Sequence, residues 1–232
     1  MSAALTLPEG RRVVLAPELE GVLSVGIIAV DGAAVGPGES VTPEIRRVAD
    51  AHRARWADRL PSEIPPLQEA RRLYHAVGIQ PTRHRPSSEA LLRRVLKGED
   101  LYVISNVVDA CNLASLAFLL PIGLYDRRKL QGTVTFRLGG PGEEYPGIRK
   151  GPVHLEGRLG LFDDAGPFGS PTSDSARTCV DQGTTDLLGA VMATASYPAA
   201  ELAAHADLLA DALVRHAGGA VVARGLLGTE AA

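Results

Sequence analysis

Apolar positions in the first half of the chain follow the periods of regular secondary structure. Residues 22–30 form a short apolar run that is rich in β-branched side chains, which predicts a buried strand. Four segments with helical spacing come next. The predicted helices cover residues 42–60, 67–77, 87–96 and 106–120. Because prolines and glycines interrupt the pattern between them, we expect separate helices rather than one long helix.

Hydroxyl residues stand where two of these helices are expected to begin. Thr42 precedes Pro43, which suits the first helical position, and Ser87 and Ser88 open the third helix. We expect these hydroxyls to cap the helices. Residues 79–86 are expected to be extended or turn-like, because prolines restrict the residues that precede them.

The hydrophobic pattern changes after Gly132 to the alternation that is typical of strands. Residues 133–138 alternate in this way, whereas residues 199–217 return to a helical pattern. Further strands are predicted at residues 153–156, 158–162, 187–195 and, as an edge strand, 220–223. Residues 164–176 are predicted to be a loop from their composition. This mixture predicts an α+β fold rather than regular βαβ alternation.

The composition is that of an ordinary globular protein. Of 232 residues, 45% are hydrophobic and 22% are charged, which allows a substantial core. The two cysteines, Cys111 and Cys179, are far apart in the sequence, so neither a disulfide framework nor a zinc site is expected. No apolar run reaches membrane-spanning length and no signal peptide is recognisable. We therefore expect a cytoplasmic protein with no membrane partner, no metal and no cofactor.

Charge is distributed unevenly along the chain. The net charge of −3 argues against a dedicated nucleic-acid-binding protein, and no DNA partner is expected. Residues 44–97, however, hold 12 basic and 6 acidic side chains, whereas the remainder holds 12 basic and 21 acidic ones. A positive face in this region would suit phosphate groups. The alternative is a set of solvated helix surfaces whose arginine stems cover the core.

The segment 106–120 is apolar except for one polar residue in every three. These polar residues are Asn106, Asp109, Asn112 and Ser115. On a helix this spacing places them in one slanted stripe, and such a helix is expected to be surrounded by protein. In one interpretation, the stripe fixes neighbouring loops through hydrogen bonds. In the other, part of the stripe lines a pocket, and Arg137 is a candidate partner for the buried carboxylate.

A longer pattern that includes this stripe resembles the editing module, called B3/B4, of the bacterial phenylalanyl-tRNA synthetase beta chain. The family pattern runs N-x-V-D-x-T-N, then G-Q-P-L-H-A-F-D, then G-x-I-x-V-R, then G-E. The matching residues, without a gap, are Asn106, Val108, Asp109, Asn112, Pro121, Asp126, Gly132, Arg137, Gly142 and Glu143. A weaker resemblance to free-standing relatives extends over residues 71–188.

The resemblance implies a B3/B4-like fold, which is a mixed sheet or partial barrel flanked by helices. It implies a single domain over residues 1–232, with its recognisable core at residues 71–195. Residues 1–70 would add a strand and a helix, and residues 196–232 a helix and an edge strand. The implied function is binding of aminoacyl-tRNA or its aminoacyl end, with hydrolysis of mischarged tRNA in trans as the implied activity.

Three departures from the family pattern affect the implied chemistry. Gly123 replaces the family histidine of G-Q-P-L-H, which suggests a differently shaped pocket, and Cys111 replaces the family threonine. A later family acid has no match, since only Asp186 lies nearby and it is out of register. Two alternatives therefore stay open. One is a non-catalytic module that binds an amino acid or a similar small molecule, and the other is a small-molecule hydrolase that kept only the scaffold.

Candidate site residues come from the stripe, the resemblance and two loops. No nucleophile elbow or triad pattern is present, so we expect water activation, with His84 and Asp109 as candidate catalytic groups. Cys111, on an apolar helix, is expected to be an inert core residue. Residues 83–85 precede a helix N-terminus, which favours anions, and the hydroxyl-rich loop 169–175 could close over a ligand. The candidate substrate-binding residues are Arg83, Arg85, Asn106, Asn112, Ser115, Arg137, Glu143, Thr172, Asp174 and Arg177.

Overall fold

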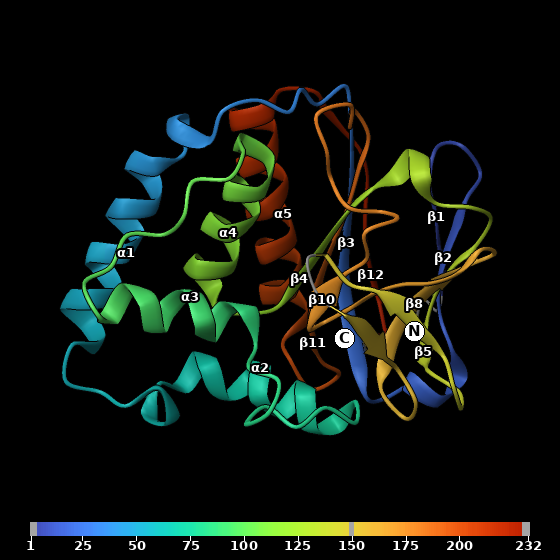
Figure 1. The fold of residues 1–232 in the computed structure, drawn as a ribbon, viewed down its shortest axis with the longest axis horizontal. Helices are drawn as coiled ribbons and strands as arrows, with labels where there is room; N and C mark the ends of the chain where they lie inside the picture. Colours follow the sequence, from blue (N-terminus) through green and yellow to red (C-terminus); the bar gives the residue numbers. More distant parts are fainter. Residues whose placement is uncertain (1–3, 149–150, 229–232) are drawn as a thin grey trace.

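Three layers of secondary structure make up the described part of the chain, residues 4–148 and 151–228 of a computed structural model. Helices lie on one side, a four-stranded sheet in the middle and a six-stranded sheet on the other side (Figure 1). Residues 1–3 and 229–232, the ends of the expected terminal segments, lie outside the described residues. The α+β fold class predicted from the sequence is confirmed.

The four-stranded sheet is antiparallel throughout. Its strand order is β12 (Ala220–Leu227), β3 (Leu23–Asp31), β11 (Leu187–Thr194) and β4 (Ile122–Asp126). The central strands β3 and β11 are buried almost end to end. Strands that are covered on both faces have continuous apolar sequences, which is why the sequence predicted these two. The predicted edge strand is confirmed as β12, and it is longer than expected.

The six-stranded sheet is mixed, because β2 and β5 pair in parallel while its other pairs are antiparallel. Its strand order is β1 (Ala4–Thr6), β2 (Arg12–Leu15), β5 (Val134–Leu138), β8 (Leu159–Asp163), β9 (Gly166–Ser170) and β10 (Ser173–Asp174). Strands β6 (Glu144–Pro146) and β7 (Pro152–His154) form a separate ribbon. The loop predicted at residues 164–176 was wrong, since β9 and β10 lie there. Glycine and proline lower strand propensity, but pairing with β8 overrides it.

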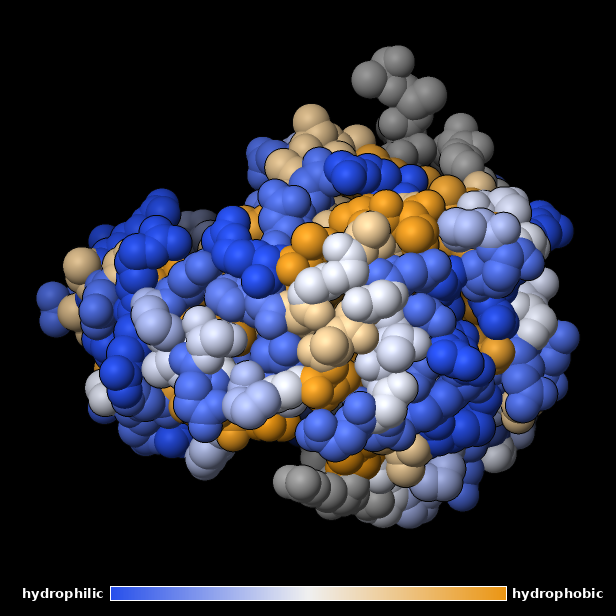
Figure 2. Space-filling model, turned by 90° about the horizontal axis from the view of Figure 1, so that it is seen from above, coloured by the Kyte–Doolittle hydropathy of each residue, from blue (hydrophilic) through white to orange (hydrophobic). Residues whose placement is uncertain are grey.

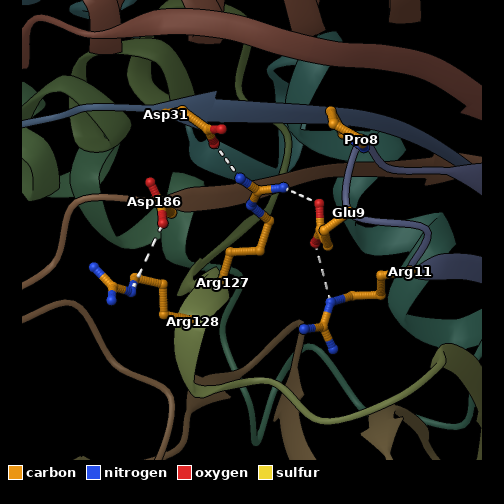
Figure 3. Close-up of a pocket in the computed structure, with 7 residues that line it drawn as sticks. All are labelled: Pro8, Glu9, Arg11, Asp31, Arg127, Arg128 and Asp186. Atoms are coloured by element: carbon orange, nitrogen blue, oxygen red, sulfur yellow. Dashed lines mark hydrogen bonds and ion pairs between the residues drawn. The ribbon is translucent and has the colours of Figure 1, made fainter.

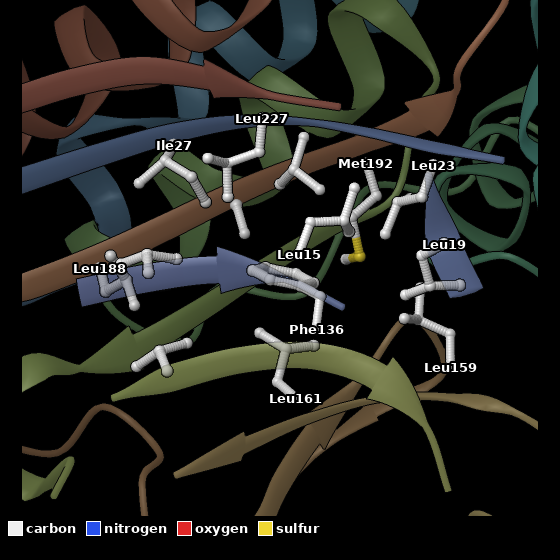
Figure 4. Close-up of a cluster of buried hydrophobic side chains, with 14 of the residues drawn as sticks. Leu15, Leu19, Leu23, Ile27, Phe136, Leu159, Leu161, Leu188, Met192 and Leu227 are labelled. Carbon is white, nitrogen blue, oxygen red and sulfur yellow. The ribbon is translucent and has the colours of Figure 1, made fainter. Parts of the chain in front are cut away.

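The interface between the two sheets holds a large hydrophobic core (Figure 4). Leu15 and Phe136 of the six-stranded sheet belong to the same buried cluster as Ile27, Leu188 and Met192 of the four-stranded sheet. Burial of each such side chain stabilises the fold by about 1.5–3 kcal/mol. The sheets also approach each other at both edges, where β1 lies beside β12 and β10 beside β4. This arrangement agrees with the mixed sheet or partial barrel that the resemblance implied.

Helices α4 (Asn106–Phe118) and α5 (Ala199–Ala217) cover the other face of the four-stranded sheet. Helices α1 (Thr42–Trp56), α2 (Pro65–Ala76) and α3 (Ser87–Leu96) form an outer lobe beside α4. The surface of this lobe is mainly hydrophilic, and apolar residues gather between it and the sheets (Figure 2). Within the described residues, no helix combines the length and apolar character that a membrane span requires.

Helix capping differs from the sequence prediction at two helices. Thr42 makes no capping hydrogen bond in α1, and neither Ser87 nor Ser88 caps α3. The reason is position, because Val41 and Pro86 occupy the cap sites and the hydroxyl residues already lie inside the helices. Helix α4 does have a side-chain cap, because the Ser105 hydroxyl accepts a hydrogen bond from the Val108 amide at 3.3 Å.

Candidate functional site

A cavity of about 480 Å³ opens beside α4, where the helix faces β4 and the segment that follows β9. Its wall is mainly apolar, with aliphatic side chains at half of the lining positions and a few polar groups. The lining residues are Ser87, Ile104, Val108, Cys111, Asn112, Ser115, Ile122, Leu124, Ile148, Asp174, Cys179 and Val180. A hollow of this size and character is typical of a small-molecule site. Part of the polar stripe therefore borders a pocket, as one of the two sequence interpretations required.

Helix α4 supplies two polar residues of the stripe to this cavity. Asn112 and Ser115 are three residues apart, so they lie on neighbouring positions of one helix face. The Ser115 hydroxyl donates a hydrogen bond to the Leu120 carbonyl at 2.9 Å. This bond holds the end of α4, where Leu119 adopts the left-handed conformation (φ 63°) and turns the chain toward β4. The Ser115 hydroxyl is thus committed as a donor and keeps only acceptor capacity for a ligand.

Among the described lining residues, Asp174 is the one carboxylate. It ends the short strand β10, and its backbone carbonyl accepts a hydrogen bond from the Ile148 amide at 3.1 Å. Burial raises the pKa of the Asp174 carboxyl to about 7, because the charged form loses its hydration, and the Tyr125 hydroxyl opposes this shift. Near neutral pH this carboxyl is therefore able to exchange a proton.

The ring of Tyr125 lies between two glycines close to Asp174. A Cβ at Gly123 on β4 or at Gly169 on β9 would lie 2.4 Å from the Tyr125 hydroxyl oxygen. The ring also packs edge-on against Phe168, with 5.0 Å between ring centroids. Burial raises the pKa of the Tyr125 hydroxyl, so this group is neutral at physiological pH. The two glycines therefore make room for a neutral tyrosine behind the polar end of the cavity.

The described lining of the cavity has one acidic side chain and no basic one. No lysine, arginine or histidine is among its described lining residues. Cys111 and Cys179, which are distant in the sequence, both line it. Burial raises the pKa of the Cys111 thiol, which keeps this thiol protonated near neutral pH. The lining suits a ligand that combines an apolar group with a positive charge, and it disfavours an anion.

Asn106, the first residue of the stripe, joins two segments away from the cavity. Its amide nitrogen donates hydrogen bonds to the carbonyls of Ala34 and His216, both at 2.9 Å. Its amide oxygen accepts a hydrogen bond from the Gly36 backbone at 2.8 Å. Asn106 therefore fixes a loop to the end of α5, as the other sequence interpretation expected.

Asp109 also lies outside the cavity lining, and the prediction that it pairs with Arg137 was wrong. Asp109 accepts a hydrogen bond from the Ile104 amide at 3.0 Å. Burial raises the pKa of the Asp109 carboxyl, and this hydrogen bond opposes the shift. Arg137 instead forms two hydrogen bonds of 2.7 Å with Glu143. These bonds lower the pKa of Glu143 to about 2, so the two residues form a local ion pair between β5 and β6.

Thr172 and Arg177 belong to the segment around β10, but neither is among the lining residues. Arg177 forms two hydrogen bonds with Asp163, at 2.8 and 3.0 Å, and the Asp163 side chain is fully buried. The Thr172 hydroxyl shares a hydrogen bond of 3.0 Å with the Ser170 hydroxyl in the turn before β10. Of the candidates in this segment, the structure brings Asp174 to the cavity.

Residues Arg83, His84 and Arg85 form a turn before α3 and are not among the lining residues. The backbone amides of Arg83 and His84 both donate to the Gln80 carbonyl, at 3.0 and 2.8 Å. The Arg85 guanidinium lies 3.7 Å from the carboxylate of Glu89. Neither candidate catalytic group, His84 or Asp109, borders the cavity.

A second hollow, of about 490 Å³, lies between the N-terminal turn and the end of β4 (Figure 3). Besides Pro8, its lining residues are Glu9, Arg11, Asp31, Arg127, Arg128 and Asp186. The buried Arg127 contacts both Glu9 and Asp31, and the remaining arginines each contact one carboxylate of the set. Because three cations and three anions are paired with one another, this hollow is best explained as an ion-pair network that joins chain segments.

Several lining residues carry no sequence signal that could have identified them. Ser87, Ile148 and Cys179 come from three segments that are far apart in the chain. Cys179 has no partner at metal-ligand spacing, and Ile148 is a lone apolar residue beside glycine and proline. Only the fold brings these residues to one wall.

These features define an α+β protein with a small, largely apolar cavity between a helix and an edge strand. The sequence profile of the B3/4 domain matches residues 69–217, and the chain belongs to this family, which confirms the resemblance seen at residues 106–143. The chain also aligns with the solved N-terminal fragment of the phenylalanyl-tRNA synthetase beta-subunit from Pyrococcus horikoshii, at 12% identity and a TM-score of 0.45. The alignment covers 90% of this chain and 49% of that fragment, so the chain spans about half the length of the fragment. No curated protein matches.

Proposed function

We propose that this protein binds the aminoacyl end of an aminoacyl-tRNA in the cavity beside α4. Membership of the B3/4 family supports this class of ligand. The observation that carries the proposal is the pairing of an aliphatic wall with a single carboxylate, Asp174, in the described lining. The α-ammonium group would pair with Asp174, and an apolar amino-acid side chain would lie against Val108, Ile122 and Leu124.

The charge of the lining favours an ester over a free amino acid. A free amino acid carries a carboxylate as well as an ammonium group, and a buried carboxylate needs a cation or several N–H donors. The described lining offers no basic side chain. An aminoacyl ester has the ammonium group and the side chain but lacks the carboxylate, so its charge and polarity match those of the cavity lining.

Hydrolysis of the ester would depend on Asp174. One oxygen of the Asp174 carboxylate would hold the ammonium group, and the other would take a proton from water as the water oxygen attacks the ester carbonyl. The same proton would then pass to the ribose oxygen that leaves, which regenerates the carboxylate. Two observations favour the second candidate, a non-catalytic binding module: His84 does not border the cavity, and the Ser115 hydroxyl already donates to the Leu120 carbonyl.

A panel of mischarged tRNAs separates these two candidates. Loss of the ester is followed with the wild-type protein, with Asp174→Asn and with Asp58→Asn, which alters an exposed acid outside the cavity. Faster ester loss that disappears only in Asp174→Asn supports hydrolysis. Binding without ester loss supports the non-catalytic module. The proposal is discarded if no tRNA in the panel loses its ester faster than in buffer and none binds at low salt.

The nature of the small ligand is tested by thermal stabilisation. A protein that binds a ligand only in its folded state melts at a higher temperature as the ligand concentration rises. We expect apolar amino-acid methyl esters to raise the melting temperature of the wild type more than the matching free amino acids. Equal stabilisation by both would contradict the preference for an ester, and stronger stabilisation by the free amino acids would favour the free amino acid as the ligand.

A further inference from the structure

Three arginines converge on one buried carboxylate on the first turn of α3. The Glu89 side chain is 1% exposed, and it lies 2.8 Å from Arg71, 2.8 Å from Arg93 and 3.7 Å from Arg85. Burial raises the pKa of Glu89, but hydrogen bonds from Arg71 and Arg93 outweigh it and lower the pKa overall, so Glu89 is ionised at neutral pH. One negative charge therefore faces three positive ones, and the cluster keeps an excess of positive charge.

This excess charge borders an open groove of about 350 Å³ along α3. Four cations line the groove, namely Arg85, Arg93, Arg94 and Lys97, together with Ala90, Glu99 and Tyr102. Glu99 pairs with Arg94 at 2.7 Å, which leaves the lining as a whole strongly positive. The contrast with the hollow in Figure 3 is clear, because there the opposite charges are equal in number.

An exposed aromatic ring stands in the same groove. Tyr102 is 69% exposed, and the Arg94 guanidinium lies 4.1 Å from its ring centroid. Proteins that hold single-stranded nucleic acids combine such a ring, on which a base stacks, with cations that contact the phosphates. The groove on α3 has both parts of this combination.

The segment that carries Tyr102 also connects the groove to the cavity. Tyr102 lines the groove, whereas Ile104, two residues further on and 62% exposed, lines the cavity. Ser87, the first residue of α3, lines the cavity as well. The ten residues of α3 extend over about 15 Å, which matches roughly four nucleotides at the strand spacing of a duplex.

We propose that the groove along α3 holds the single-stranded 3′ end of an RNA whose terminal aminoacyl group enters the cavity. This inference rests on the proposed function and adds the path of the RNA. Phosphates contact the cations of the groove, and a base stacks on Tyr102. The aminoacyl group then passes Ile104 to reach Asp174.

The test compares an RNA hairpin that has a four-nucleotide 3′ extension with the same hairpin ending blunt. Fluorescence anisotropy gives the affinity between 50 and 200 mM salt. Four phosphate contacts predict a slope of about −2.8 in a plot of log affinity against log salt, which is roughly a 50-fold loss over this range. Tyr102→Ala should weaken binding of the extended hairpin on the order of tenfold and leave the blunt hairpin unaffected.

Charge-matched variants show whether the groove is the binding surface. Arg85→Gln with Lys97→Gln should reduce the slope to about −1.4. Arg12→Gln with Arg47→Gln removes the same charge from exposed positions outside the groove and should leave the slope unchanged. Equal binding of the two hairpins, or equal losses in the two double variants, would overturn the proposal.

Stabilisation by a small amino-acid ester, measured in parallel, separates the groove from the cavity. The groove variants should bind the ester as the wild type does, because the ester has no phosphate. If the ester fails to stabilise the protein while the extended hairpin binds as described, the cavity ligand is wrong and the groove stands. If the ester binds but the hairpins do not differ, the groove proposal alone fails.

Discussion

The ring of Tyr125 fills the space that a side chain at Gly123 would need. A Cβ at Gly123 would lie 2.4 Å from the Tyr125 hydroxyl oxygen and 2.8 Å from each of two ring carbons. The family pattern has a histidine at this position, and a histidine could not share this space with Tyr125. Ile122 and Leu124 form the wall of the cavity beside β4, whereas residue 123 and Tyr125 are on the other face of this strand, and Tyr125 packs into the core between the sheets.

Gly123→Ala should destabilise the protein, because the added methyl group overpacks a closed space. We expect a loss of about 1–3 kcal/mol in the free energy of unfolding. Urea denaturation measures it. Gly151→Ala is the matched control, since a Cβ there meets nothing within 4 Å and should change stability by less than about 0.5 kcal/mol. Similar effects of the two substitutions would contradict the packing argument.

Tyr125→Phe should relieve part of that overpacking. The Tyr125 hydroxyl is buried and lies near the Asp174 carboxyl, whose pKa shift it opposes, but it makes no well-aligned hydrogen bond with a described residue, so its removal alone should change stability by less than about 1 kcal/mol. The hydroxyl oxygen is also the atom nearest to a Cβ at Gly123. The double variant should therefore lose less stability than the sum of the two single losses. Additive losses would show that the ring carbons alone cause the clash.

Protein stability should also depend on the ionisation of Asp174. Its pKa is about 7 in the folded state against an ordinary value of 3.8. Between these two pH values the folded protein holds a proton that the unfolded chain has released, so the contribution of Asp174 to stability falls as the pH rises. The fall amounts to at most about 4 kcal/mol and levels off above pH 7.

Asp174→Asn removes this dependence, because an amide does not ionise. Urea denaturation of both proteins between pH 4.5 and 8 should show the variant gaining stability relative to the wild type as the pH rises, with a plateau above pH 7. Taking the difference between the two proteins cancels the contributions of other titrating groups. A difference that stays constant over this range would show that the Asp174 carboxyl is not buried as described.

Arg177 should affect stability and leave ligand binding unchanged. Its partner Asp163 is fully buried, and Arg177→Ala would leave that carboxylate without its cation. We expect a loss of about 3 kcal/mol. Arg46→Ala is the control, because Arg46 and Asp100 are both 61% exposed and their ion pair contributes at most about 1 kcal/mol. Stabilisation by an amino-acid ester should be the same in both variants, and its loss in Arg177→Ala would place Arg177 in the site.

Elements that are covered by protein were predictable from the sequence. The apolar patterns at residues 22–30, 187–195 and 199–217 predicted every end of β3, β11 and α5 to within one residue, because burial makes the periodicity strong. Strands β9 and β10 were missed because their composition has low strand propensity. Two of the five residues of β9 are glycines, and one of them, Gly169, leaves room for the ring of Tyr125.

The candidate site was only partly predictable, and the geometry of α4 explains why. Residues that recur every three positions rotate by about −60° each time, so Asn106 and Ser115 point to opposite sides of the helix. The first half of the stripe therefore reaches loops, and the second half, Asn112 and Ser115, reaches the cavity. Cys179 lines the same cavity but comes from a segment far from α4 in the sequence, so no local sequence pattern predicts its place there.

The two cysteines of the cavity should differ in reactivity. Burial raises the pKa of the Cys111 thiol, so little of its reactive thiolate is present at pH 8. Cys179 follows the turn at residues 176–178 and is partly exposed, and its thiol donates to the Ala176 carbonyl at 3.4 Å. Iodoacetamide should therefore label Cys179 first, as peptide mass spectrometry would show. Cys179→Ser should take up little label under the same conditions, because the chain has only two cysteines.

The same labelling reports on the cavity itself. Because Cys179 lines the cavity, an apolar amino-acid ester bound there should slow its modification, and the slowing should saturate with ester concentration. Asp174→Asn should lose this protection, since the ammonium group of the ester would have no carboxylate partner. Protection that survives in Asp174→Asn, or labelling of Cys111 and Cys179 at equal rates, would contradict the arrangement of the site described above.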